Sequence, residues 1–188
     1  IIFGCGCFWG AEKCFWKLPG VITTSVGYAG GEKNNPTYYE VCSGLTGHSE
    51  VVRVIWDKRE IDVSDLLKMF WECHDPTQKN RQGNDMGTQY RSAIYYKNEN
   101  NIKTILASKE QYQTELSKKN LGLIETEIKM IDSYFYAEQY HQQYLASAGS
   151  RQYCSASPTK VKLGVFTGSN YKLEDHIWEN FNWEVDKC

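Results

Sequence analysis

The sequence predicts an α+β fold in which helices pack on one mixed sheet to form a two-layer sandwich. Segments with the pattern of strands alternate along the chain with segments of helical periodicity, and the strands are few and short. The periodic pattern stops after Ser150, which predicts a long irregular C-terminal tail. We see no repeat and no Pro- or Ser-rich linker. We therefore expect a single domain over residues 1–188, with a core at residues 1–147 and the tail at residues 148–188.

The first half of the chain is expected to form three strands and two helices. An apolar stripe at positions 8, 11, 14, 15 and 18 predicts a helix over residues 8–18. Ser64 is the expected N-cap of a second helix, which runs to Cys73 and stops before Pro76. The predicted strands are residues 1–5, 21–28 and 50–56.

The second half is expected to hold two strands and two helices. The longest helix is predicted over residues 99–119, where apolar side chains recur on one face. A shorter helix is predicted over residues 137–147, and the polar stretch at 78–89 reads as a loop. The predicted strands of this half are residues 92–96 and 127–131.

Composition and charge exclude several classes of partner. The net charge is -2 and the sequence pI is about 6.1, so no basic surface for nucleic acid is indicated. The longest apolar runs are too short to span a bilayer, and no partner membrane is expected. Aromatic residues make up 14% of the chain, which leaves open whether the rings fill the core or line a pocket.

The cysteines indicate thiol chemistry in a reducing compartment. There are seven, so they cannot all pair within the chain, and no C-x-x-C motif is present. Free thiols favour the cytoplasm, and no signal peptide is seen. The chain begins at Ile1 rather than Met, which leaves a preceding leader open. The four histidines match no compact zinc pattern, so no metal is expected, and His74 reads as a structural hydrogen-bonding residue.

Cys7 lies where the first predicted strand turns into the first predicted helix. Unpaired N–H groups and the helix dipole at that point favour the thiolate, which predicts a lowered pKa for Cys7. Phe8 and Trp9 supply rings beside the sulfur, which suits a small apolar group with an electrophilic centre. Burial as an inert core cysteine explains the same residue equally well, and the local sequence does not choose.

A series of motifs resembles the methionine sulfoxide reductase A family. The segment Gly6-Cys7-Phe8-Trp9-Gly10 is similar to the active-site signature of that family, and further blocks follow in the family's order up to about residue 146. These blocks are Gly27-Tyr28-Ala29-Gly30-Gly31, Asn35-Pro36-Thr37-Tyr38, Gly47-His48-Ser49-Glu50, His74-Asp75-Pro76-Thr77, Gln89-Tyr90-Arg91-Ser92 and Tyr140-His141-Gln142-Gln143-Tyr144.

The resemblance implies a role for each residue of a catalytic site. Cys7 attacks the sulfoxide sulfur, and Glu50 protonates the oxygen, which leaves once protonated. Tyr38 and Tyr90 donate hydrogen bonds to the same oxygen, while Phe8 and Trp9 hold the methyl group. Asp85, in the loop Gly83-Asn84-Asp85-Met86-Gly87, binds water or the substrate backbone. From the residues alone, Glu50 would be an exposed strand-end carboxylate, Asp85 a solvated turn residue, and any one tyrosine a packing residue.

The tail is expected to close the catalytic cycle. The attack leaves Cys7 as a sulfenic acid, which Cys154 converts to a disulfide. By resemblance, thioredoxin then reduces that disulfide, and the substrate is the S epimer of methionine sulfoxide, free or in oxidised proteins under repair. The family often has a short Gly-rich tail with a second recycling cysteine, but this chain continues for about 30 residues to Cys188. Whether Cys188 relays the disulfide is left open.

Two other functions compete with this one. A thiol peroxidase would use Cys7 and Cys154 in the same way but would not need the methyl cradle. A non-catalytic module that binds methionine would turn over neither substrate. No cofactor is expected, the protein is expected to be a monomer, and its sandwich is expected to be a ferredoxin-like plait.

Overall fold

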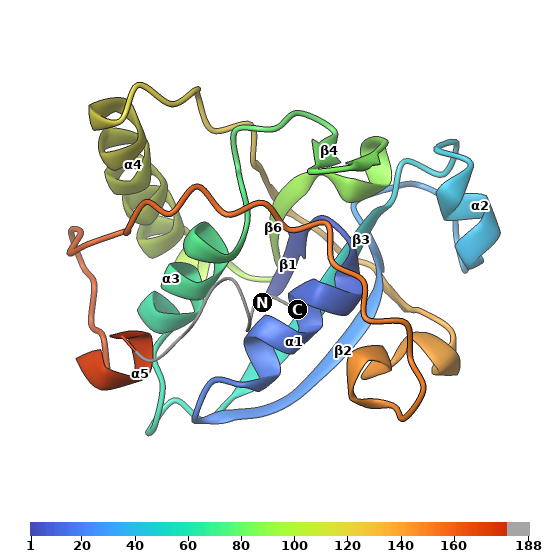
Figure 1. Ribbon diagram of the computed structural model, residues 1–188, viewed down its shortest axis with the longest axis horizontal. Coiled ribbons are helices and arrows are strands. Elements are labelled where there is room, and N and C mark those ends of the chain that lie inside the picture. The colour runs from blue at the N-terminus through green and yellow to red at the C-terminus, as the bar shows by residue number, and fades with distance from the viewer. Residues whose placement is uncertain (180–188) are drawn as a thin grey trace.

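The computed structural model describes residues 1–179, and a six-stranded sheet organises them (Figure 1). Neighbouring strands follow the order β7-β6-β1-β3-β2-β8. The β6–β7 pair is parallel and the other four pairs are antiparallel, so the sheet is mixed as predicted. The strands are β1 (Ile2–Cys5), β2 (Val21–Ala29), β3 (Ser49–Trp56), β6 (Ser92–Tyr96), β7 (Glu127–Met130) and β8 (Tyr134–Tyr136).

Three helices pack with one face of the sheet to form the main core. They are α1 (Phe8–Trp16), α3 (Val63–Cys73) and α4 (Ile102–Lys118), and their apolar side chains share one cluster with Phe3, Val52 and Val54. Because side chains alternate along a strand, Val51 points to the other face, into a smaller cluster. The result is an α+β fold with helices layered on a mixed sheet.

The smaller elements are short and lie between the strands or follow the last of them. Two-residue strands β4 (Arg81–Gln82) and β5 (Asp85–Met86) form a hairpin inside the predicted loop. The remaining short elements are α2 (Tyr38–Cys42), α5 (Asp175–Glu179) and the 3-10 turns η1 (Thr88–Tyr90), η2 (Glu99–Asn101), η3 (Gln139–His141) and η4 (Tyr144–Ala146).

Most of the predicted elements are confirmed to within three residues at each end, but two predictions are wrong. Asp62, not Ser64, caps α3, because the Asp62 carboxylate accepts the Ser64 N–H and the Asp65 carboxylate accepts the Asp62 N–H. The helix predicted over 137–147 is absent. Gln143 adopts a left-handed conformation with φ 47°, so two separate 3-10 turns form there.

The tail runs back over the helices as an irregular strap. Residues 151–166 carry no helix or strand, and Figure 1 shows them crossing the front of the molecule toward α3 and α4. The buried carboxylate of Glu72 accepts the Leu163 N–H at 2.9 Å and pairs with Lys162 at 3.1 Å. Leu163 itself is fully buried. Within residues 1–179 no helix is long and apolar enough to cross a membrane.

Candidate active site

Cys7 occupies the turn between β1 and α1, as its position in the sequence predicts. It is the N-cap residue of α1, and the residue before it, Gly6, has a φ of 91°. A Cβ at Gly6 would lie 2.6 Å from the Gln82 side chain, so only glycine fits there. The tight turn therefore brings the Cys7 thiol to the start of the helix against the β4–β5 hairpin.

The predicted lowering of the pKa of Cys7 is wrong for the protein without substrate. The N–H groups of Trp9 and Gly10 do bond the sulfur and lower its pKa, as expected for a helix start. Burial has the larger effect, and the Glu50 and Asp85 carboxylates add to it, so the pKa of Cys7 lies well above its usual range. The thiol is therefore kept protonated until the surroundings of the sulfur change.

Glu50 faces this thiol from the centre of the sheet. It lies on β3 with the same parity as Val52 and Val54, so its side chain points to the helix face. Its carboxyl group accepts the Phe8 N–H at 3.0 Å and is 2% exposed. Burial, with a smaller contribution from Asp85, raises the pKa of Glu50 to about 8. Glu50 is therefore a protonated acid at neutral pH.

One cavity of about 540 Å³ is lined by seven of the residues singled out from the sequence. We call it the active-site cavity. Cys7, Glu50 and Asp85 supply its reactive and acidic groups. Its aromatic walls include all four predicted rings: Phe8, Trp9, Tyr38 and Tyr90. Burial raises the pKa of both tyrosines well above the usual range, so their hydroxyl groups stay protonated and can donate hydrogen bonds.

Asp85 has one carboxylate oxygen in use and one without a partner. Its Oδ1 accepts the Tyr153 hydroxyl at 2.7 Å. Its Oδ2 is buried and accepts no hydrogen bond in the described part of the chain. Buried acceptors are normally satisfied, so this oxygen is suited to an N–H group of a bound molecule. Tyr153, which sequence reasoning missed as a site residue, also lines the cavity.

His141 and Tyr144 fix the indole wall and were also missed. The Nε1–H of Trp9 donates to Nδ1 of His141 at 3.0 Å. The Tyr144 ring stacks on the indole with centroids 3.9 Å apart and planes 18° apart. Both residues belong to a matched motif block, but that block gave no indication of their contact with Trp9. Because the contact spans more than 130 residues, only the fold brings the two segments together.

Glu138 joins two further segments beneath the cavity. Its carboxylate accepts the Tyr28 hydroxyl at 2.8 Å and the Tyr38 N–H at 2.8 Å. Tyr28 pairs with Glu50 across β2 and β3, and its ring contacts Phe8 at 5.9 Å. Glu138 thereby ties α2 to the floor of the cavity, a role that the sequence did not indicate.

The tail places Cys154 beside the cavity. Of its two neighbours, Tyr153 bonds Asp85, and the hydroxyl oxygen of Ser155 lies 3.7 Å from the Cβ position of Gly6. Cys154 is held in a disulfide bond, whereas Cys7 is a free thiol, so a Cys7–Cys154 bond is not present in this state. Cys188, the other cysteine predicted to take part, lies outside the described residues.

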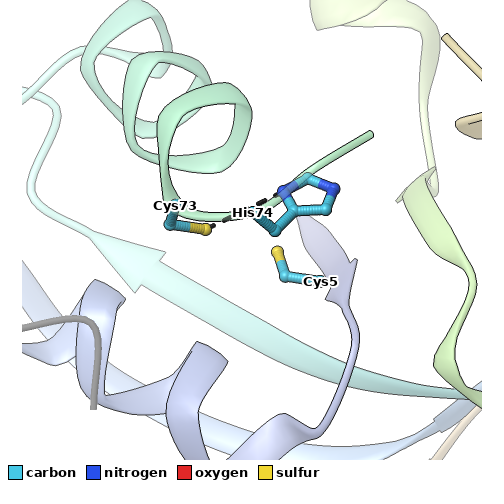
Figure 2. Close-up of side chains that lie close together, drawn as sticks. All are labelled: Cys5, Cys73 and His74. Carbon is cyan, nitrogen blue, oxygen red and sulfur yellow. Dashed lines mark hydrogen bonds between the residues drawn. The ribbon is translucent and has the colours of Figure 1, made fainter. Parts of the chain in front are cut away.

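A second group of sulfur and nitrogen ligands lies in the core. Figure 2 shows Cys5, Cys73 and His74, whose ligand atoms lie within 4.8 Å of one another; we call this group the core thiol cluster. Both imidazole nitrogens of His74 are already used, one with the Phe70 carbonyl and the other with the Ser92 hydroxyl, each at 2.7 Å. An imidazole engaged in this way has no lone pair for a metal. The structural role expected of His74 fits these contacts.

The geometry of the cavity defines a class of protein. A buried acid beside a thiol can pass its proton to an oxygen atom while the sulfur is oxidised, which is the chemistry of an oxidoreductase that works through cysteine. The family follows from comparison with known proteins. The model of the family described as peptide methionine sulfoxide reductase matches residues 1–171, and the chain belongs to this family.

Individual relatives agree with that assignment. The chain is 56% identical over 161 residues to a peptide methionine sulfoxide reductase MsrA of Vibrio vulnificus, covering 86% of this chain and 77% of the relative. It resembles the solved structure of methionine sulfoxide reductase A of Corynebacterium diphtheriae with a TM-score of 0.73, 45% identity and coverage of 81% and 76%. The reduced form of Mxr1 from Saccharomyces cerevisiae gives a TM-score of 0.74, 34% identity and coverage of 84% and 90%.

Proposed function

We propose that this chain reduces the S epimer of methionine sulfoxide, free or within oxidised proteins, to methionine. The observation that carries the proposal is the buried Glu50 carboxyl, whose pKa of about 8 keeps it protonated beside the Cys7 thiol. A sulfoxide oxygen is a poor leaving group until it is protonated, and the sulfur of methionine sulfoxide carries a methyl group that an aromatic cavity can accept. The cavity supplies both requirements.

The reaction begins with attack of Cys7 on the sulfoxide sulfur. Glu50 gives its proton to the oxygen, and the hydroxyl groups of Tyr38 and Tyr90 donate hydrogen bonds to it. The Cys7 sulfur supplies the electron pair, and the proton that its thiol loses returns to the Glu50 carboxylate. The oxygen passes to Cys7 as a sulfenic acid, and methionine is released as the thioether. Phe8 and Trp9 hold the methyl group, and Asp85 Oδ2 accepts an N–H of the substrate backbone.

Cys154 resolves the sulfenic acid in the second stage. Its thiol condenses with the sulfenic acid of Cys7 to form a disulfide and water. The position of Cys154 between Tyr153 and Ser155, both of which contact the active-site segments, supports this role. Cys154 must be a thiol at this stage, so its disulfide has to be reduced before each turnover.

Thioredoxin supplies that reduction by dithiol exchange. Cys188 acts as the relay that carries the disulfide away from the cavity. The length of the tail beyond Cys154 supports the relay, because a distant thiol can be brought back along an irregular strap.

The proposal extends to the organisation of the protein. We propose one catalytic domain over the whole chain, acting as a monomer in the cytoplasm. Its central part is a ferredoxin-like plait, supported by the element order β1-α1-β2-β3-α3-β6 and by the strand order β6-β1-β3-β2 within the sheet. Free thiols such as Cys5 and Cys42 fit a reducing compartment.

A single-turnover experiment tests the function. The protein is reduced, freed of reductant and mixed with a peptide carrying either epimer of methionine sulfoxide, and the disulfides formed are mapped by mass spectrometry. Loss of the S epimer alone, with a Cys7–Cys154 bond, is the expected result, and a Cys154–Cys188 bond marks the relay. Consumption of neither epimer contradicts the proposal, and oxidation by a hydroperoxide in place of the sulfoxide would make the protein a peroxidase.

A further inference from the structure

A single cation lies at the rim of the active-site cavity. Among the cavity-lining residues of the described chain, Arg151 is the only basic one. It comes from the tail, two residues before Tyr153, and its side chain is exposed to solvent. No sequence motif singled it out, and it takes no part in the reaction proposed above.

Contacts on both sides hold Arg151 in this place. Its backbone N–H donates to the Tyr144 hydroxyl at 3.2 Å, and Tyr144 is the residue stacked on Trp9. Its guanidinium carbon lies 5.5 Å from the centre of the Tyr153 ring. The hydroxyl of that ring is bonded to Asp85. Arg151 is therefore fixed to two walls of the cavity, rather than being a charge on a distant part of the surface.

The guanidinium group has no acidic partner of its own. No carboxylate in residues 1–179 lies within salt-bridge distance of Arg151. The nearby acids are also occupied or neutral: Glu50 is protonated, and Asp85 is separated from Arg151 by the Tyr153 ring that contacts both. An arginine fixed at the mouth of a cavity and lacking a carboxylate can accept one from a bound molecule.

We propose that Arg151 recognises a carboxylate next to the oxidised methionine, so that the enzyme prefers sulfoxides with an acidic neighbour. The proposal rests on the proposed function, because it assigns the substrate of the same cavity. The unpartnered Asp85 Oδ2 accepts a backbone N–H, and Arg151 receives the negative charge on the far side of Tyr153. The carboxylate can be an Asp or Glu side chain beside the methionine or the α-carboxylate of the methionine itself.

Substrate pairs that differ only in charge test the preference. One series is a peptide with methionine sulfoxide flanked by Glu, Gln or Lys, before or after it. The other compares N-acetyl methionine sulfoxide with its amide. The kcat/KM ratio of the acidic to the neutral substrate is measured with dithiothreitol as reductant, at low ionic strength and in about 1 M salt, where the Debye length is about 3 Å.

The expected ratio for the wild-type protein at low salt is about two- to fivefold, the range for an exposed ion pair, and it should arise in KM. Salt should bring the ratio to one. Arg151→Gln should also bring the ratio to one, Arg151→Lys should keep part of it, and Arg151→Glu should invert it. The control is Arg59→Gln. Arg59 is exposed and follows the end of β3, whereas Glu50 lies at the start of that strand, so this change should leave the ratio as in the wild type.

The outcomes separate this proposal from the function on which it rests. If the peptide arm alone shows the ratio, the carboxylate is a neighbouring side chain; if the N-acetyl arm alone shows it, the carboxylate is that of the methionine. Equal kcat/KM values for acidic and neutral substrates at low salt in both arms would overturn the preference while leaving the reductase intact. Failure to reduce any sulfoxide would instead contradict the proposed function.

Discussion

Cys5 and Cys7 are two residues apart, yet their side chains lie in opposite kinds of surroundings. Cys5 points into the core thiol cluster, where His74 has a hydrogen-bond partner for each nitrogen. Cys7 opens into the active-site cavity, where Asp85 Oδ2 is buried without a partner among the described residues. Both regions gather sulfur with ionisable groups, so the residue types alone do not separate them.

The difference lies in whether the polar groups are satisfied. A closed set of hydrogen bonds stabilises one arrangement and leaves nothing to offer a ligand. A site with unused acceptors and a protonated acid can form new hydrogen bonds with a bound substrate. Glu50 is the clearest case, because burial holds its proton where a sulfoxide oxygen can take it. The comparison therefore predicts that changes in the cavity alter rates and changes in the core cluster alter stability.

The largest effect is expected from removing the Cys7 thiol. Cys7→Ser should lower the single-turnover rate by at least about 10³-fold, because a hydroxyl group neither attacks sulfur nor forms a sulfenic acid. Cys73→Ala, the matched change in the core thiol cluster, should lower the melting temperature and leave the rate close to that of the wild type. A folded Cys73→Ala protein without activity would break the distinction between the two regions.

Glu50→Gln should slow the chemical step by about 10²-fold or more, since general acid catalysis contributes about 10²–10⁴-fold. The amide keeps the volume of the side chain and an oxygen to accept the Phe8 N–H, so substrate binding should be nearly unchanged. Rapid-quench measurement of the first turnover over a range of peptide concentrations separates the rate constant from the dissociation constant. An unchanged rate constant would remove Glu50 from its role as the acid.

The fold and the site could be predicted where the signal is local or carried by motifs. Short runs with the composition of strands identified the central strands, and the resemblance to the family identified most of the residues that line the cavity. The short helix α2 was overlooked although its signal is present: Thr37 and Glu40 have the spacing of a capping box, and each bonds the backbone of the other.

Other features depend on residues that are distant in sequence. The pKa of Cys7 was predicted to be lowered from the helix start alone, but burial raises it, with smaller contributions from Glu50 on the sheet and Asp85 on the hairpin. The segment around Gln142 lost its predicted helix because the Gln142 side chain bonds the backbone of Val26 on β2. Neither effect can be predicted from a short stretch of sequence, because each depends on segments that only the fold brings together.

In the core thiol cluster, His74 should make the stability of the protein depend on pH. Burial lowers its pKa from 6.5 to about 4, so the folded protein holds it neutral while the unfolded chain binds a proton below 6.5. The free energy of unfolding should therefore fall as the pH drops from 6.5 toward 4, by up to about 3 kcal/mol from this residue. In urea unfolding, the free energy of unfolding of His74→Asn should fall less between pH 6.5 and pH 4 than that of the wild type. His176→Asn, which changes an exposed histidine, should show the same fall as the wild type.

The smallest effect is expected at the indole wall. His141→Phe removes the acceptor for the Trp9 Nε1–H, and one such bond contributes about 0.5–1.5 kcal/mol, so KM should rise about two- to tenfold with little change in kcat. His141→Gln keeps an acceptor, so its KM should rise much less than that of His141→Phe.

The pH profile separates this positioning role from simple packing. Burial lowers the pKa of His141, and Glu138 at 4.0 Å opposes that shift. The other described groups that face the imidazole are the rings of Phe8, Trp9, Tyr38 and Tyr140. The imidazole therefore stays an acceptor at neutral pH and loses this capacity only as the pH falls below 6.5. The KM of the wild type should rise on that acidic side, and the KM of His141→Gln should not. Parallel profiles would reduce His141 to a packing residue and leave Tyr144 as the support of the indole.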